Sequence, residues 1–289
     1  MAHARCVVCD SNTELIYPEC SDYFCGAPGK YDYYFCDECK TIQLHPLISE
    51  EELIPLYQQY YTETLALPDI STTSSWKSFA RRCILSQIGY PADRIERILG
   101  FFLSLFPPIR EKAYYDLGYC FVPYKSQCRL LEIGCGTGWF LKIMQNHGWE
   151  VYGIEPDADA VEIAQKHYGL TKNQVLVGTL SLNELPFPRE SFDAIIIRHV
   201  IEHVPNPKEV LAKAFQLLRK GGVIALATPN GRSLASRWFG RYWRGLTPPW
   251  HLVLYNPTSI RALLKSVGFA KVRVRTRVFP AHWVYTASQ

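Results

Sequence analysis

The chain has 289 residues, and 48% of them are hydrophobic, which is enough to bury one large core and a small second one. The net charge of +4 is too weakly basic for an extended nucleic-acid interface. No apolar run reaches membrane-spanning length and the first residues lack an apolar signal core, so we expect a cytoplasmic protein. Ten cysteines in such a protein favour metal binding or buried thiols over disulfides.

Two cysteine pairs lie near the start of the chain, each with two residues between its thiols. The four are Cys6, Cys9, Cys36 and Cys39. This spacing lets both thiols of a pair bind one tetrahedral metal ion, and four sulfurs leave no open position for a substrate. The pattern predicts a structural zinc ribbon over residues 1–48, with four unmetallated thiols as the alternative. Cys20 and Cys25 lie between the pairs, so the exact ligand set stays open.

Residues 49–128 have a helical pattern. Ser49 and Glu52 match a capping box that opens a helix. Apolar residues then recur at helical spacing from Trp76 to about Tyr119, where two prolines end one helix before another begins at Ile109. We expect the apolar run 101–106 to be buried, because burial is a commoner fate for such a run than contact with a lipid surface.

A glycine-rich turn follows the apolar run 130–133, which has the pattern of a buried parallel strand. The glycines are Gly134, Gly136 and Gly138. Glycines allow a tight turn and a close backbone approach to a ligand, and helical spacing resumes directly after them. Trp139 stands where a dinucleotide fingerprint needs glycine or alanine, and no lysine before Lys142 completes a phosphate-binding loop. The pattern predicts a turn that holds a different nucleotide-like cofactor.

Strands and helices alternate after this turn. The predicted strands are 150–155, 175–180, 192–199, 223–228 and 271–278. Residues 282–286 could add a strand antiparallel to the last of these, but the sequence leaves open whether the final strand of the sheet is present. The predicted helices are 157–167, 207–219 and 257–267. This alternation predicts an α/β fold with a Rossmann-like sheet and helices on both faces, over residues 129–289. Glu155 ends the second strand of this sheet, a position from which an acid accepts both ribose hydroxyls; the alternative is a charge at a helix start.

The run 129–140 resembles motif I of the class I S-adenosylmethionine-dependent methyltransferases, and the elements after it agree. The resemblance implies S-adenosylmethionine as cofactor and a helical cap over it. It assigns to the cofactor Glu132, Gly134, Cys135, Gly136, Gly138, Glu155, Pro156, Thr179, Leu180, Arg198 and His199. Thr179 replaces the Asp that the family commonly uses for adenine. The ribbon resembles that of bacterial methyltransferases, many of them in surface-polysaccharide and modified-sugar gene clusters.

Histidines supply the candidate bases. The family often keeps a histidine at the position of His251, so we predict His251 as general base and His199 as the second choice. A structural histidine bonded to a loop carbonyl is the alternative. Glu202 and His203 match the segment after the fourth strand in quinone- and sugar-type methyltransferases. Some quinone enzymes bind a divalent metal there with one more Glu, where this chain has His199, and we favour a packing and hydrogen-bonding role over a metal.

A segment rich in arginine and aromatic residues follows the fifth strand. Its members are Arg237, Trp238, Arg241, Tyr242 and Arg244, with the arginines at the spacing of one helical face. Guanidinium groups suit a phosphate and aromatic rings suit a base or a sugar, while a solvated basic face is the alternative. The predicted acceptor-binding residues are Glu202, His203, Arg237, Arg241 and Tyr242.

These features predict a methyltransferase acting on a small acceptor, and they leave open whether that acceptor carries a phosphate. Our first hypothesis is O-methylation of a sugar carried on a nucleotide or a lipid, and the second is O-methylation of a quinone-like or natural-product phenol. An RNA methyltransferase is less favoured, because Arg198 to Ile201 is not the motif of base-amino methylation and no cysteine follows Cys135 to attack a base. We expect no nucleic-acid partner and no membrane span.

Overall fold

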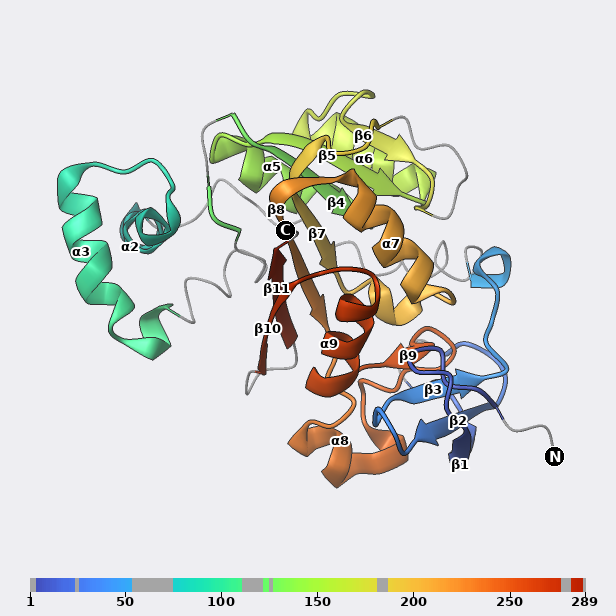
Figure 1. The fold of residues 1–289 in the computed structure, drawn as a ribbon. Helices are drawn as coiled ribbons and strands as arrows, with labels where there is room; N and C mark the ends of the chain where they lie inside the picture. Colours follow the sequence, from blue (N-terminus) through green and yellow to red (C-terminus); the bar gives the residue numbers. More distant parts are fainter. Residues whose placement is uncertain are drawn as a thin grey trace. The chain divides into compact units, whose positions relative to one another are not determined.

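The computed structural model describes residues 4–23, 26–53, 75–110, 122–124, 127–180, 187–276 and 282–287, the stretches 75–77 and 282–287 by their backbone only. The chain forms two compact units. One consists of residues 1–65, 180–190 and 197–289, and the other of residues 66–179 and 191–196. The labels in Figure 1 are used below. The boundaries predicted after residues 48 and 128 remain a prediction.

A seven-stranded sheet has the order β10-β11-β8-β7-β4-β5-β6. Its strands are β4 (Arg129–Ile133), β5 (Glu150–Glu155), β6 (Val175–Val177), β7 (Phe192–Arg198), β8 (Leu218–Thr228), β10 (Lys271–Thr276) and β11 (His282–Ala287). β5 is parallel to β4 and β6, whereas β11 is antiparallel to β8 and β10. The flanking helices are α5 (Trp139–Asn146), α6 (Ala158–Tyr168), α7 (Pro207–Leu217) and α9 (Pro257–Ser266). The predicted Rossmann-like fold is confirmed, and β11 is the antiparallel last strand whose presence the sequence left open.

Continuous apolar strands build the centre of this sheet. Residues 194–197 of β7 are fully buried, as expected for a strand covered on both faces. β6 ends at Val177 rather than at the predicted Leu180. The boundary between α7 and β8 was also predicted wrongly, because α7 ends at Leu217 rather than at Arg219 and β8 begins at Leu218 rather than at Val223. The cause is local, because Leu218 already has extended backbone angles (φ −75°, ψ 137°).

A helical hairpin precedes the sheet in the second unit. It consists of α2 (Ser75–Leu85), the 3₁₀ turn η1 (Ser86–Ile88) and α3 (Arg94–Ser104). Gly89 ends η1 with φ 94°, and Asp93 opens α3 through a capping box with Glu96. The helix predicted to restart at Ile109 is described only as far as Arg110. The expected burial of 101–106 is wrong, since Phe101, Phe102, Leu105 and Phe106 are all exposed.

The cysteine-rich segment forms a second sheet with the order β1-β2-β3-β9. Its strands are β1 (Thr13–Cys20), β2 (Tyr31–Cys36), β3 (Ile42–His45) and β9 (Val253–Leu254). The sequence did not predict β9, which joins residues more than two hundred positions apart. Asn256 strengthens this junction, because its Nδ2 donates to the carbonyl oxygens of Cys39 and Lys40 at 2.9 and 2.7 Å while its Oδ1 caps α9.

None of the described helices combines the length and the apolar character that crossing a bilayer requires.

Candidate functional site

The glycine turn after β4 has the backbone that only glycine adopts readily. Gly134, Gly136 and Gly138 have φ values of 69°, 52° and 77°. At Gly138 a Cβ atom would also lie 2.8 Å from Cδ1 of Leu170 and 2.9 Å from Cβ of Ala164. At Gly136 a Cβ would meet no atom within 4 Å, so the open space beside this backbone is available to a ligand.

Glu155 lies against this turn. Its Oε2 accepts a hydrogen bond from the Gly136 amide at 2.8 Å, and its Oε1 accepts one from the Asp157 amide at 3.1 Å. Burial raises the pKa of the Glu155 carboxyl to about 7, although both amide hydrogen bonds oppose the rise. The structure therefore brings together the acid and the glycine that the sequence assigned to the cofactor.

The other predicted cofactor residues divide between the two units. Glu132, Cys135, Pro156 and Thr179 belong to the same unit as the glycine turn, and the first two are buried. Leu180, Arg198 and His199 belong to the other unit. His199 follows β7 with φ 52°, a left-handed conformation that is uncommon for a non-glycine residue, and its amide donates to the Ala227 carbonyl at 2.8 Å. Their roles remain predictions.

A buried carboxylate and two imidazoles form a cluster after β7. One ligand atom each from Glu202, His203 and His251 lies within 4.8 Å of the others. Thr228 donates its hydroxyl to Oε2 of Glu202 at 2.9 Å, and Nδ1 of His199 lies 3.5 Å from Oε1. The rings of His203 and His251 are 4.8 Å apart, edge to face. The third member of this cluster is thus His251, and His199 lies beside the carboxylate of Glu202.

Backbone carbonyls fix the orientation of both rings. Nδ1 of His203 lies 2.6 Å from the Trp250 carbonyl oxygen, and Nδ1 of His251 lies 2.6 Å from that of Gly245. A carbonyl only accepts, so in the neutral rings Nδ1 carries the proton and Nε2 is the basic nitrogen. Burial and the neighbouring His251 lower the pKa of His203 to about 4, and burial lowers the pKa of His251. Both rings are therefore neutral at pH 7.

Glu202 stays ionised beside these rings. Burial opposes its ionisation, but the close approach of His199 and the other nearby imidazoles outweigh burial and lower the pKa of the carboxyl. The cluster thus offers one fixed negative charge and two basic nitrogens.

Residues of the small sheet hold the loop that carries His251. The Tyr33 hydroxyl lies 2.8 Å from the Leu246 carbonyl oxygen and 2.9 Å from that of His251. Asp22 accepts a hydrogen bond from Nε1 of Trp250 at 3.2 Å. The sequence did not identify Tyr33 or Asp22, because no local pattern indicates hydrogen-bond partners more than two hundred positions away.

The arginine-aromatic segment does not form one helical face. α8 (Leu234–Phe239) ends at Gly240, whose φ of 51° and ψ of −124° break the helix, and the turn η3 (Gly240–Tyr242) follows. Arg241 donates to the Pro18 carbonyl, and the Tyr242 ring lies 5.8 Å from that of Tyr23. The prediction of one continuous face for Arg237, Arg241 and Arg244 is therefore wrong, although all three belong to one exposed or half-buried segment.

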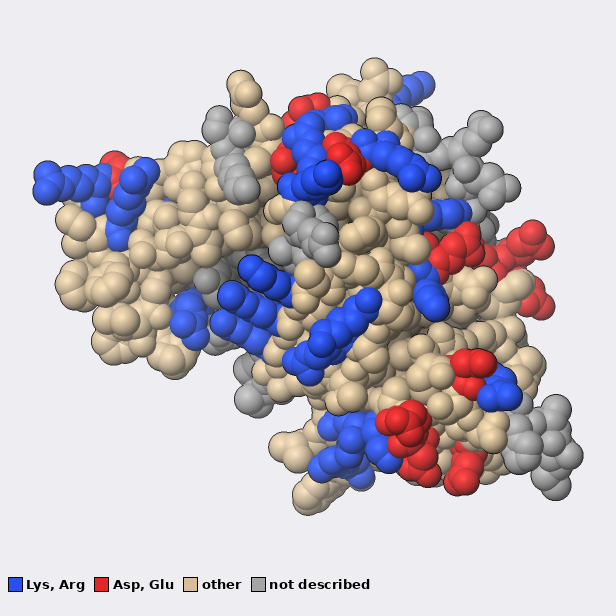
Figure 2. Space-filling view, viewed as in Figure 1, with Lys and Arg blue, Asp and Glu red and all other residues tan. Residues whose placement is uncertain are grey.

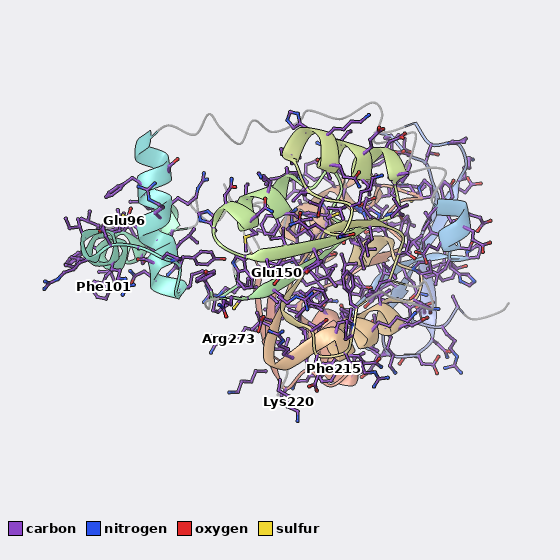
Figure 3. All side chains as sticks on the ribbon, turned by 90° about the horizontal axis from the view of Figure 1, so that it is seen from above. Glu96, Phe101, Glu150, Phe215, Lys220 and Arg273 are labelled. Carbon is purple, nitrogen blue, oxygen red and sulfur yellow. The ribbon has the colours of Figure 1, made fainter. Side chains whose placement is uncertain are left out.

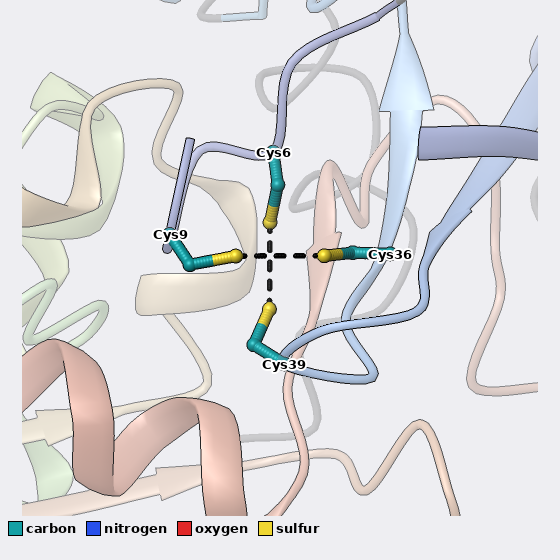
Figure 4. A group of neighbouring side chains, drawn as sticks. All are labelled: Cys6, Cys9, Cys36 and Cys39. Atoms are coloured by element: carbon teal, nitrogen blue, oxygen red, sulfur yellow. Dashed lines mark hydrogen bonds between the residues drawn. The ribbon is translucent and has the colours of Figure 1, made fainter. Parts of the chain in front are cut away.

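Four cysteines converge at the edge of the small sheet (Figure 4). Their sulfurs pair as Cys6 with Cys39 and Cys9 with Cys36, at 3.5 Å each. A tetrahedral zinc site with Zn–S bonds of about 2.3 Å holds its sulfurs about 3.8 Å apart, so the four thiols fit zinc after a small expansion. Cys20 is not in this group, since its thiol faces the Tyr17 carbonyl, and Cys25 lies outside the described residues.

Comparison with known proteins gives concordant matches. A family model described as a methyltransferase domain matches residues 90–274. The ubiquinone biosynthesis O-methyltransferase of Haemophilus ducreyi is 36% identical over 107 residues, which cover 35% of this chain and 45% of that protein. Its counterpart from Rhodopseudomonas palustris is 33% identical over 158 residues, covering 50% of this chain and 61% of that protein. The chain spans about half the length of the first curated relatives it matches.

A solved structure of similar fold is a methyltransferase of Thermotoga maritima, described as S-adenosylmethionine-dependent and a possible histamine N-methyltransferase. It is 19% identical, with a TM-score of 0.49, covering 82% of this chain and 98% of that one. The methyltransferase family model covers more than half of the present chain. The chain therefore belongs to the methyltransferase domain family.

Proposed function

We propose that the protein transfers the methyl group of S-adenosylmethionine to the hydroxyl of a small quinone-like phenol. The observation that carries this proposal is the cluster of Glu202, His203 and His251, which presents neutral imidazoles beside a fixed carboxylate. A phenol needs such a base, because its oxygen becomes a good nucleophile only as the proton leaves. The similarity to ubiquinone biosynthesis O-methyltransferases supports the same acceptor class.

In this mechanism the bound cofactor supplies a methyl group already activated by a positively charged sulfur. Glu155 would accept hydrogen bonds from the ribose hydroxyls, and the glycine turn would admit the rest of the cofactor to its backbone. Gly134 and Gly138 shape that turn. Thr179 and Leu180 would contact the adenine. The remaining predicted cofactor contacts are Glu132, Cys135, Pro156, Arg198 and His199.

His251 would remove the acceptor proton. Nε2 would take the proton of the acceptor hydroxyl, so that the acceptor oxygen could accept the methyl group that the cofactor supplies when bound. The charge that develops on the ring is stabilised by Glu202 and by the Nδ1 hydrogen bond to the Gly245 carbonyl. His203 fixes the edge of the His251 ring, and the proton passes to solvent afterwards.

A second candidate acceptor is a sugar carried on a phosphate. The observation that favours it is the segment with exposed Arg237 and Tyr242 and half-buried Arg241, beside which Tyr23 adds a second ring. Guanidinium groups bind phosphate through paired hydrogen bonds, and aromatic rings stack on sugars.

Methyl-labelled cofactor and two acceptor panels distinguish the candidates. We expect turnover of alkylated catechols and hydroquinones, with less than a tenfold loss when Arg237 and Arg241 are both replaced by alanine. Turnover restricted to nucleotide sugars, together with a loss of more than tenfold in that double variant, would overturn the phenol proposal in favour of the sugar.

We further propose that the four cysteines hold a structural zinc ion. Metal analysis of the purified protein should find one zinc per chain, and Cys36→Ala should lose it and unfold at lower temperature, because the ion joins both cysteine pairs. Cys20→Ala is the matched control, since Cys20 is equally buried in the ribbon but lies outside the group of four. Zinc loss in the Cys20 variant, or its retention in the Cys36 variant, would contradict this ligand set.

A further inference from the structure

The outward side of α3 is an apolar surface that the described part of the chain does not cover. Its large apolar side chains are between 39% and 65% exposed. The members are Ile95, Ile98, Leu99, Phe101, Phe102, Leu105 and Phe106, and Ile109 follows in the next turn. Their spacing follows the helix period, so they form one stripe rather than scattered contacts. We call these residues the α3 stripe.

The opposite side of α3 is locked onto α2. A Cβ atom at Gly100 would lie 1.8 Å from the Cys83 carbonyl oxygen, so the two backbones are in direct contact there. Arg82 donates to Glu96 at 2.8 Å, and Gln87 donates to the Arg97 carbonyl at 2.9 Å. Figure 3 shows Glu96 and Phe101 on this helix. Because these contacts fix the rotation of α3, the helix cannot turn its apolar side inward.

Basic residues accompany the stripe. Residues 75–110 contain six lysines and arginines against two acids. Both acids are engaged within the hairpin, Asp93 with the Glu96 amide and Glu96 with Arg82. Arg94 and Arg97 are exposed on the first turns of α3. Figure 2 shows a broad uncharged surface over α2 and α3, with lysines and arginines gathered at its edge.

We propose that the α2–α3 hairpin binds the surface of an anionic membrane, with the α3 stripe inserted at the level of the headgroups. An amphipathic helix with phenylalanine and leucine on one side and arginine beside them is the pattern of an interfacial helix. Anionic headgroups complement the net positive charge of the hairpin. A protein partner would need hydrogen-bonding groups within its contact, and from Ile98 to Phe106 the stripe contains none that is exposed.

Vesicle flotation of the full-length protein, without cofactor or acceptor, tests this binding independently of the proposed reaction. We expect flotation with phosphatidylglycerol-containing vesicles, at least tenfold weaker flotation with phosphatidylcholine alone, and weakening by salt. The double variant Ile98→Asp/Phe102→Asp should bind at least tenfold more weakly. Leu234→Asp is the matched control, since Leu234 is an equally apolar, exposed side chain on α8.

The single variant Phe102→Trp gives a second measurement that needs no disruptive charge. Because the chain already has seven tryptophans, the measured quantity is the difference in fluorescence between this variant and the unmodified protein. The difference should shift to the blue and be quenched by brominated lipid when anionic vesicles are added. The proposal is overturned if the protein does not float, if the Leu234 variant fails while the double variant binds, or if lipid leaves the fluorescence of the Phe102→Trp variant unchanged. It is also overturned if sedimentation shows a dimer that the double variant abolishes, which would assign the stripe to a second copy of the chain.

Discussion

Replacing Glu155 with glutamine should weaken S-adenosylmethionine binding about 100-fold, since hydrogen bonds to a charged partner contribute about 1.5–3 kcal/mol each. The change keeps the size of the side chain but removes the charge that two ribose hydroxyls would share. Calorimetric titration with the cofactor measures the effect. Glu162→Gln is the control, because Glu162 is an exposed acid on α6 that pairs with Lys166. Equal affinities in the two variants would exclude Glu155 from the cofactor site.

The pH dependence of binding provides a sharper form of this test. The pKa of Glu155 is raised to about 7, so without ligand the carboxyl is mostly protonated at pH 6 and mostly ionised at pH 8. Ribose hydroxyls donate to the ionised form. Affinity should therefore fall about tenfold from pH 8 to pH 6, one pH unit being a factor of ten for a single group. The same slope in Glu155→Gln would refute this assignment.

The free energy of unfolding of the unliganded protein should decrease as the pH rises, whereas the affinity for the cofactor should increase. Unfolded Glu155 ionises near its ordinary pKa of 4.5, whereas the folded protein keeps the proton until about pH 7. Burial of the neutral carboxyl is fully stabilising below pH 4.5, and that contribution is lost as the pH rises through 7. Bound cofactor should offset the loss.

Local patterns in the sequence were sufficient to predict the cofactor half of the site. Gly136 and Glu155 belong to consecutive strand-turn units, and parallel pairing of β4 with β5 brings their ends together without help from distant residues. The same reasoning predicted α9, whose cap at Asn256 lies within the segment itself. Where cap, period and strand pairing agree within about thirty residues, the fold follows from the sequence.

The histidine cluster depends on contacts that no local pattern encodes. His203 and His251 are separated by 48 positions, and the loop of His251 is held by Tyr33 from a ribbon strand. The sequence suggested a group of His199, Glu202 and His203, because these residues are close in the chain. In the structure the group consists of Glu202, His203 and His251.

The α3 stripe shows a second limit of sequence patterns. The helical period at Phe101 and Phe102 was read correctly, but the pattern cannot say which side of a helix is covered. Gly100 determines which side is covered. Because its backbone lies directly against Cys83, the side of α3 that carries Gly100 faces α2.

Replacing His251 with asparagine should lower kcat about 100- to 10,000-fold, the usual range for loss of a general base. Cofactor affinity should not change, which calorimetry checks in the same sample. Because burial lowers the pKa of His251, the base stays neutral in more acidic solution than an exposed histidine. The decrease of kcat/KM on the acid side of its pH profile should therefore occur below pH 6.5, and it should be absent in the His251→Asn variant. His167→Asn, an exposed histidine on α6, is the control.

Tyr33→Phe separates the position of His251 from its chemistry. The variant keeps the buried ring and removes only the hydroxyl near the Leu246 and His251 carbonyls. Activity should fall about tenfold through misalignment, with zinc content and the pH of the acid limb unchanged. If His251→Asn instead loses a second metal ion beyond the ribbon zinc, the cluster binds metal and His251 is not the base. If both variants keep full activity, the proton must leave by another route.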